Sequence, residues 1–114
     1  MGQLIRLAER LNPQRLVFFD RAELNQLLSL YARHVADGEW RDYALDLSDG
    51  VAAFSVFRRA DDGPAFIITK RAPSAGGRGR FALARGARRL REGPNLRDVL
   101  APLERRLTLV PPTA

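Results

Sequence analysis

The amino-acid sequence predicts an α+β domain with a single antiparallel sheet of about five to six short strands and two amphipathic helices packed on one face. Three observations support this class. A helical apolar stripe follows Asp20, short alternating segments separated by turn residues fill the middle of the chain, and a second helical stripe follows Asn95. Because the helices flank the strands rather than alternate with them, we expect the other sheet face to be open.

A chain of 114 residues fits one domain with a single core. We expect this domain to span residues 14–110, with a short helix or tail at 1–13 and a tail at 111–114. The first segment has leucines at helical spacing, and Pro13 stops the pattern.

The first strand and the organising helix are expected next. Residues 15–19 form an apolar run that fits a short strand. Asp20 suits the N-cap, and Glu23 completes a capping box, in which each side chain accepts from the backbone N–H of the other residue. Gly38 suits the position just after the helix. The expected apolar stripe comprises Leu24, Leu27, Leu28, Tyr31 and Val35.

Alternation with a period of two then predicts three strands. Residues 39–47 and 51–59 are separated by the turn signal Ser48-Asp49-Gly50, which predicts a hairpin. A third strand is expected at residues 65–71. The side chains expected to share apolar faces are Tyr43, Leu45 and Leu47 in the first strand, Ala52, Phe54 and Val56 in the second, and Phe66 and Ile68 in the third.

The last third of the chain predicts a loop, a basic hairpin and a helix. Residues 74–79 are rich in glycine and serine and fit a mobile loop. Residues 80–85 and 87–91 fit a second hairpin around Gly86. Asn95 suits the cap of a terminal helix, in which Pro102 is expected to cause a kink or a break. The expected apolar face of that helix comprises Leu96, Val99, Leu100, Leu103 and Leu107.

Charge is distributed unevenly along the chain, whose net charge is +6. Up to Phe57 there are six basic and eight acidic residues, a balance of −2; from Arg58 onward there are thirteen and five, a balance of +8. Such asymmetry favours a basic surface that binds a polyanion. Eighteen of the nineteen basic residues are arginine, a bias that a GC-rich genome also produces.

The basic hairpin is the candidate nucleic-acid site, and RNA is the expected partner. Phe57 or Phe81 would offer a surface on which bases stack. The alternative is an interaction or regulatory adaptor that binds another protein through the open sheet face or the acidic segment 39–49. The candidate nucleic-acid-binding residues are Arg78, Arg80, Arg85, Arg88, Arg89 and Arg91.

Residue types argue against catalysis, a metal site or a cofactor. The chain has no cysteine, and His34 is its single histidine, so we expect neither a nucleophile–histidine pair nor a histidine metal site. At the end of the helix, His34 is expected to interact with the last carbonyl groups. The glycines at 76–79 resemble a phosphate cradle only weakly, and a hairpin connection is the favoured interpretation. We therefore expect a binding protein rather than an enzyme.

Location and assembly are less constrained by the sequence. The N-terminus lacks the pattern of a signal peptide, and no apolar run reaches the length of a membrane span. We therefore expect a cytoplasmic protein without a membrane partner. The residue pattern specifies no oligomeric state.

Three segments also carry a family resemblance: VFFDRAELNQLLSLYARHVADGEWRDYALDL, AAFSVFRRADDGPAFIITKRAP and LAPLERRLTLV. They resemble a family of small alphaproteobacterial proteins known only as a domain of unknown function. The resemblance extends from Leu16 to about Val110 and is densest in GEWRDYALD, at 38–46. It implies a bacterial, cytoplasmic, single-domain protein, and it implies neither an activity nor catalytic residues.

Overall fold

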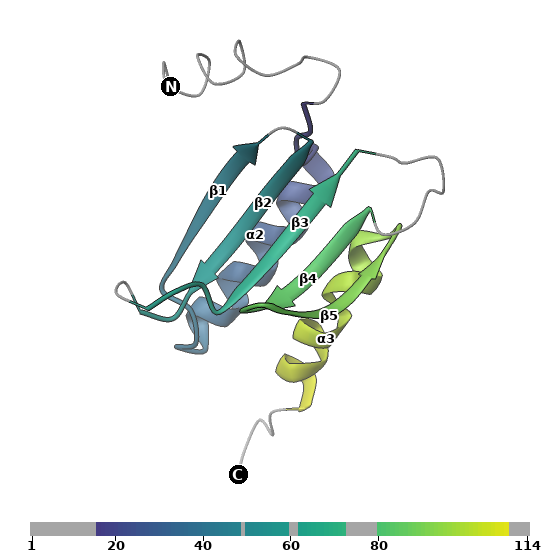
Figure 1. Cartoon of the computed structure of the whole chain (residues 1–114). Coiled ribbons are helices and arrows are strands. Elements are labelled where there is room, and N and C mark those ends of the chain that lie inside the picture. Colours follow the sequence, from purple (N-terminus) through teal and green to yellow (C-terminus); the bar gives the residue numbers. More distant parts are fainter. Residues whose placement is uncertain (1–15, 49, 60–61, 73–79, 110–114) are drawn as a thin grey trace.

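The computed structural model describes residues 16–48, 50–59, 62–72 and 80–109 (Figure 1). The predicted N-terminal helix or tail, the loop at 74–79 and the C-terminal tail lie outside these residues. In order, the elements are α2 (Arg21–Ala36), β1 (Asp42–Ser48), β2 (Val51–Phe57), β3 (Phe66–Arg71), β4 (Phe81–Arg85), β5 (Arg88–Gly93) and α3 (Leu96–Leu109).

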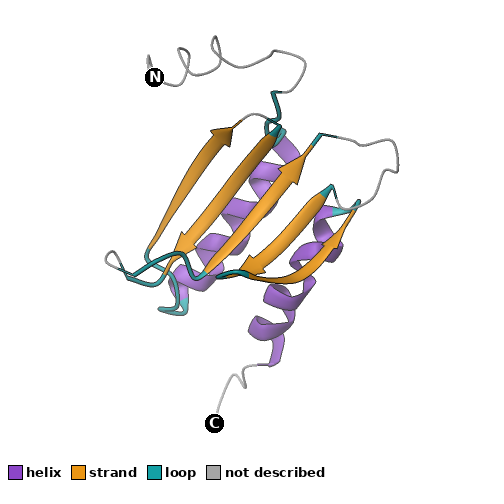
Figure 2. Cartoon of the chain, in the orientation of Figure 1, coloured by secondary structure: helices purple, strands orange, loops and turns teal. Residues whose placement is uncertain are grey.

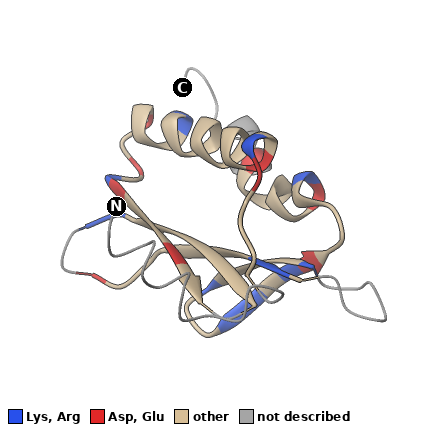
Figure 3. Cartoon of the chain, turned by 90° about the horizontal axis from the view of Figure 1, so that it is seen from above, with Lys and Arg blue, Asp and Glu red and all other residues tan. Residues whose placement is uncertain are grey.

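The strands form one sheet in the order β1-β2-β3-β4-β5, and every neighbouring pair is antiparallel. Both helices lie on the same side of this sheet, and no described helix or strand covers its other face (Figures 2 and 3). The predicted α+β class is therefore confirmed, with five strands in the sheet.

The strand expected at residues 15–19 is wrong, because its described part, residues 16–19, joins no sheet. Val17 and Phe19 insert their side chains into the core. Between them, the carbonyl oxygen of Phe18 accepts a hydrogen bond of 2.8 Å from Lys70 Nζ. The segment therefore contacts a side chain of β3 and packs on the core without adding to the sheet.

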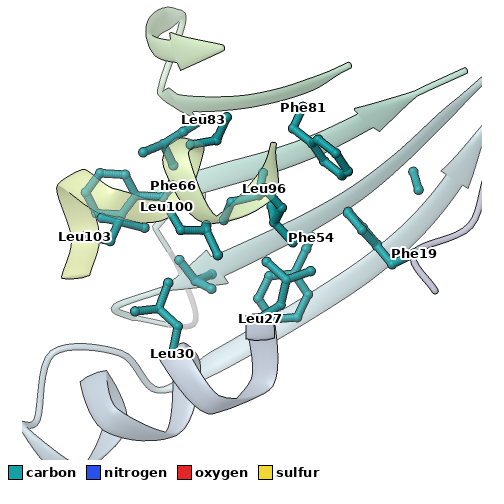
Figure 4. Close-up of a cluster of buried hydrophobic side chains, with 14 of the residues drawn as sticks. Phe19, Leu27, Leu30, Phe54, Phe66, Phe81, Leu83, Leu96, Leu100 and Leu103 are labelled. Atoms are coloured by element: carbon teal, nitrogen blue, oxygen red, sulfur yellow. The ribbon is translucent and has the colours of Figure 1, made fainter. Parts of the chain in front are cut away.

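The core lies between the sheet and the two helices (Figure 4). The expected apolar faces of β2 and β3 are confirmed, since Ala52, Phe54, Val56, Phe66 and Ile68 are all buried. Each such side chain removes apolar surface from water, worth about 25 cal/mol per Å². The α3 side chains in the core are Leu96, Val99, Leu100 and Leu103.

Helix α2 is capped as predicted but turned relative to the expected stripe. Asp20 Oδ1 accepts from the N–H of Glu23, and Glu23 Oε1 accepts from the N–H of Asp20, both at 2.8 Å. Gly38 follows the helix with a φ of 77°, a conformation that glycine adopts without strain. The buried face, however, comprises Leu27, Leu30 and His34.

Leu28 and Val35, which the stripe placed in the core, are 38% and 40% exposed, so this part of the prediction is wrong. The reason is that α2 has more apolar residues than one face of the sheet covers. Its Tyr31 flank faces β1, where the two rings of Tyr31 and Tyr43 lie 5.0 Å apart. Burial and, to a lesser extent, the nearby Asp42 carboxylate raise the pKa of Tyr31 above 10.0.

Helix α3 begins as predicted, with Asn95 Oδ1 accepting from the N–H of Arg97 at 2.9 Å. Of the kink or break expected at Pro102, the break is wrong, because the helix continues from Leu96 to Leu109; the kink stays a prediction. Leu100 and Leu103 are buried on either side of the proline. Their packing on the sheet holds the backbone helical although Pro102 donates no hydrogen bond.

Candidate nucleic-acid interface

The basic hairpin formed by β4 and β5 is confirmed as an antiparallel pair. Gly86 has a φ of 61° in its turn, a conformation that an L-residue adopts only with strain. Arg85 and Arg88 are paired residues at the turn end, and both side chains are exposed. The turn therefore brings two of the candidate arginines together in solvent.

The other candidate arginines spread over the hairpin rather than forming one surface. Arg78 lies outside the described residues. Arg80 precedes β4 at the end opposite the turn, about 17 Å from Arg85 at roughly 3.4 Å per residue. It is half-buried, with its guanidinium 5.7 Å from the centre of the Phe81 ring. Arg80 is thus held beside the core.

Arg89 and Arg91 lie on opposite faces of the sheet. Arg89 pairs with Ala84 on the open face, whereas Arg91 pairs with Leu83, whose side chain lies in the core on the helix side. A bulge between Leu83 and Ala84 separates the two registers. Arg89 Nη1 also contacts Glu92 Oε2 at 3.2 Å, so part of its charge is compensated.

A hollow beside the turn is lined by residues that are far apart in the sequence. It is about 200 Å³ in volume and contains Arg58 from the β2–β3 connection and Arg85 from the hairpin; Asp62 is its acidic member. We call it the hairpin hollow; its residues are Arg58, Asp62, Gly63, Pro64, Ala65, Phe66, Arg85 and Gly86. Sequence analysis missed Arg58, although it stands at the point where the charge balance changes sign.

Of the two phenylalanines considered for base stacking, only Phe57 is on the open face. Phe81 is 4% exposed and lies in the core, so the stacking role considered for it is wrong. Phe57 ends β2 and is half-buried; it alternates with the core residues Phe54 and Val56, which places it on the other face. It directly precedes Arg58, at the same end of the sheet as the hairpin hollow.

A buried polar network, also missed by sequence analysis, joins α2 to the sheet. Lys70 is 6% exposed and faces the helices from β3. Its Nζ donates to Glu23 Oε1 at 2.7 Å and to the carbonyl of Phe18 at 2.8 Å. A signal in the sequence could have found this network. Lys70 is the chain's one lysine, and it lies two residues after Ile68, on the face of the strand that was expected to point inward.

His34 lies in the last turn of α2, as predicted, but its ring is 1% exposed. The ring stacks on Trp40 with centres 3.9 Å apart, and Nδ1 lies 2.6 Å from Glu39 Oε1. Trp40, at 2% exposed, thus closes the end of the helix. This packing gives His34 a structural role beneath Trp40.

The described residues also bear on two other kinds of site. They contain no group of three His, Asp or Glu side chains placed to hold a metal ion. Among the same residues, no helix combines the length and the apolar character that crossing a membrane requires.

Comparisons with known proteins place the chain in a family without assigning it a chemistry. No curated protein and no solved structure matches it. A family model described as "Protein of unknown function (DUF2794)" matches residues 17–100, which include α2, the whole sheet and the start of α3. The chain therefore belongs to the DUF2794 family, in agreement with the resemblance to a domain of unknown function.

Proposed function

We propose that this protein is a non-catalytic module of the cytoplasm that binds single-stranded nucleic acid, RNA in particular, through the turn end of the basic hairpin. The observation that carries the proposal is the hairpin hollow, in which Arg58 and Arg85 converge from separate elements. Arginine guanidinium groups bind phosphate with two parallel hydrogen bonds, and a pair of them suits a phosphodiester backbone.

Neighbouring exposed residues extend this surface. Arg59 follows Arg58, and Arg88 pairs with Arg85 across the turn. Among the described residues, neither Arg85 nor Arg88 has a carboxylate within ion-pair distance. Their mutual repulsion is relieved when a polyanion binds.

Phe57 supplies the second element of single-strand recognition. Bases stack on exposed aromatic rings with little sequence preference, while basic side chains follow the backbone. Phe57 lies on the open face and Arg58 follows it in the chain, so a single strand that passes around this end of the sheet would meet both the ring and the basic hollow. A duplex would present phosphates but no unstacked base, so this arrangement favours a single strand.

The alternative, an adaptor that binds a protein through the open face, has less support. The residues that meet at the centre of that face are Ala53, Ser55, Ile67, Thr69 and Ala82, and none of them is Tyr, Trp or Arg. Protein interfaces usually depend on large anchoring side chains such as Tyr, Trp and Arg.

Fluorescence anisotropy with a single-stranded RNA oligonucleotide, at several salt concentrations, tests the proposal. Each arginine contact with phosphate contributes about 0.7 to the slope of log affinity against log salt for single strands. The variant Arg58→Gln/Arg85→Gln/Arg88→Gln is expected to flatten the slope by about 2. Phe57→Ala is expected to lower affinity without changing the slope, because stacking releases no counterions.

A matched control removes the same charge from the helices through Arg21→Gln/Arg33→Gln/Arg97→Gln, all at exposed positions. This control is expected to keep most of the slope. Equal losses in both triple variants would assign binding to net charge alone. Contacts between arginine and phosphate are strong at about 50 mM salt. If the natural chain does not bind the RNA oligonucleotide under that condition, the proposal is refuted.

A further inference from the structure

Strand β1 is the outer strand at one edge of the sheet (Figure 1). Two of its apolar side chains are partly uncovered. Tyr43 pairs with Val56 and Leu45 pairs with Phe54, so both side chains are on the helix face. They are nevertheless 43% and 47% exposed. The helix layer therefore covers β2 but leaves β1 half open.

The flank of α2 beside β1 is uncovered in the same way. Leu28 and Val35 are seven residues apart and share one side of the helix with Tyr31, whose ring contacts Tyr43. Together, Leu28, Val35, Tyr43 and Leu45 form what we call the β1 flank. Exposed apolar side chains that lie together mark interaction sites, whereas isolated ones are normal on a protein surface.

Among the described residues, the edge at β5 carries more protection than the edge at β1, whose charged side chains are Asp42 and Asp46. In β5, Arg88, Arg89, Arg91 and Glu92 are exposed, and a bulge interrupts its register with β4. Charged side chains and bulges are the features with which proteins prevent edge-to-edge pairing. β1 pairs with β2 in an unbroken register over residues 42–48, so no bulge interrupts it.

The backbone groups on this edge can be identified. The N–H of Tyr43 donates to Asp42 Oδ1 at 2.8 Å, so it points away from β2. Because backbone groups of alternate residues point to the same side of a strand, Leu45 and Leu47 also present N–H and C=O groups outward. Another strand placed here would meet a regular row of donors and acceptors.

We propose that two copies of this chain pair through β1, antiparallel, with Leu45 facing Leu45 of the second copy on a two-fold axis. Residue 45 is the midpoint of β1, so this register pairs all of residues 42–48. Tyr43 then faces Leu47 of the second copy on the helix face, next to the β1 flank. In the dimer, the N–H of Tyr43 no longer donates to Asp42 Oδ1 and donates instead to the backbone carbonyl of Leu47 in the second copy.

Charge selects this register over its neighbours. In it, Asp46 faces Ala44 and Asp42 faces Ser48 of the second copy, whose hydroxyl is a hydrogen-bond donor. A two-fold axis at Ala44 would place Asp42 opposite Asp46, and an axis at Asp46 would place two aspartates in direct opposition. Like charges directly opposite each other destabilise a strand pair.

The same pairing keeps the basic regions apart. The segment up to Phe57 carries a balance of −2, whereas the segment from Arg58 onward carries +8. Joining two sheets at β1 places both β5 strands at the far ends of one continuous sheet. A closed two-fold interface of this kind also leaves no free β1 edge for further growth.

Site-directed cross-linking tests the pairing, since the chain has no cysteine of its own. In a hydrogen-bonded antiparallel pair the Cα atoms are about 5.5 Å apart, within the range that a disulfide spans. Leu45→Cys in the full chain is therefore expected to form a disulfide-linked dimer on mild oxidation. Leu90→Cys on β5 is the control, because Leu90 is 39% exposed, close to the exposure of Leu45.

Ala44→Cys tests the register, because it cross-links only if the axis lies at Ala44. Light scattering of the unmodified chain is expected to give twice the mass of one chain. Leu45→Lys is expected to halve that mass, since it places two positive charges on the axis; an unchanged melting profile of the monomer would show that the fold is kept.

If light scattering shows that the natural chain is a monomer, the proposal is overturned. That outcome includes the case in which residues 1–15, rather than a second copy, cover the β1 flank. Equal cross-linking of the Leu45 and Leu90 variants, or cross-linking of Ala44→Cys instead, would overturn it as well. These substitutions leave the hairpin hollow unchanged. Failure of the dimer is therefore distinguishable from failure of nucleic-acid binding.

Discussion

Lys70 and Arg89 both lie on strands of the same sheet and both contact a glutamate, but their surroundings differ. The side chains of Lys70 and Glu23 are 7% and 15% exposed, with 2.7 Å between Nζ and Oε1. Those of Arg89 and Glu92 are 51% and 50% exposed, with 3.2 Å between Nη1 and Oε2. The first pair is enclosed between α2 and the sheet, whereas the second stands in solvent.

The difference shows which region holds the fold and which is available for binding. An exposed ion pair contributes roughly 0–1 kcal/mol, because water and salt screen it. Removing one partner of a buried pair costs about 3–5 kcal/mol, because the other charge is left without compensation. The junction of α2 with the sheet is thus sensitive to change, while the hairpin can exchange its charged contacts at little cost.

The largest expected effect follows from breaking the buried pair. Lys70→Met is expected to lower the free energy of unfolding by about 3–5 kcal/mol, because Glu23 and the Phe18 carbonyl both lose their donor. Denaturant unfolding measures this change.

The double variant Glu23→Gln/Lys70→Met is the control for that experiment. Glutamine at position 23 keeps an acceptor for the N–H of Asp20 and carries no charge. The double variant is expected to be more stable than Lys70→Met alone. If it is less stable, the loss comes from packing and the comparison of the two ion pairs is wrong.

The next effect sharpens the contrast between buried and exposed positions within α2. Leu27→Ala is expected to cost about 2–5 kcal/mol, because Leu27 is fully buried and its loss leaves a cavity. Leu28→Ala, in the β1 flank, is expected to cost under about 1 kcal/mol in the monomer. Unfolding at low protein concentration, where a dimer dissociates, gives both values, and equal costs would contradict the observed orientation of α2.

Much of the fold was predictable from local signals. The capping box at Asp20 and Glu23, the turn at Gly50 and the alternation in Ala52, Phe54 and Val56 each depend on residues close together in the chain. The rotation of α2 was not predictable in this way. Positions 28 and 30 are both leucine, so residue type does not distinguish Leu28 from Leu30. Only packing against a neighbouring element decides which of the two is buried.

The candidate site was predictable in part for the same reason. Arginines near the hairpin turn were identified from their density in the sequence, and Arg85 and Arg88 do meet there. Arg58 and Arg85 line the same hollow only because the C-terminal ends of β2 and β4 lie at the same end of the sheet. A long-range meeting of this kind depends on strand order, which no local pattern contains. The bulge that separates Arg89 from Arg91 is likewise a property of the folded pair.

The smallest expected effect concerns the pH dependence of the two regions. It comes from Tyr31, whose ring lies beside β1 and contacts Tyr43. The pKa of Tyr31 is raised in the folded chain by burial and by Asp42, so the folded state binds its proton more tightly than the unfolded state. That stabilisation is complete below pH 10 and is lost as the pH rises through the folded-state pKa.

Tyr31→Phe is therefore expected to lose less stability than the natural chain between pH 9 and the alkaline limit of about pH 11. Unfolding curves recorded for both chains across this range measure the difference. Parallel pH profiles would show that Tyr31 titrates equally in the folded and unfolded states. In that case the helix flank above β1 is as open to water as the hairpin, and the two regions differ in their ion pairs alone.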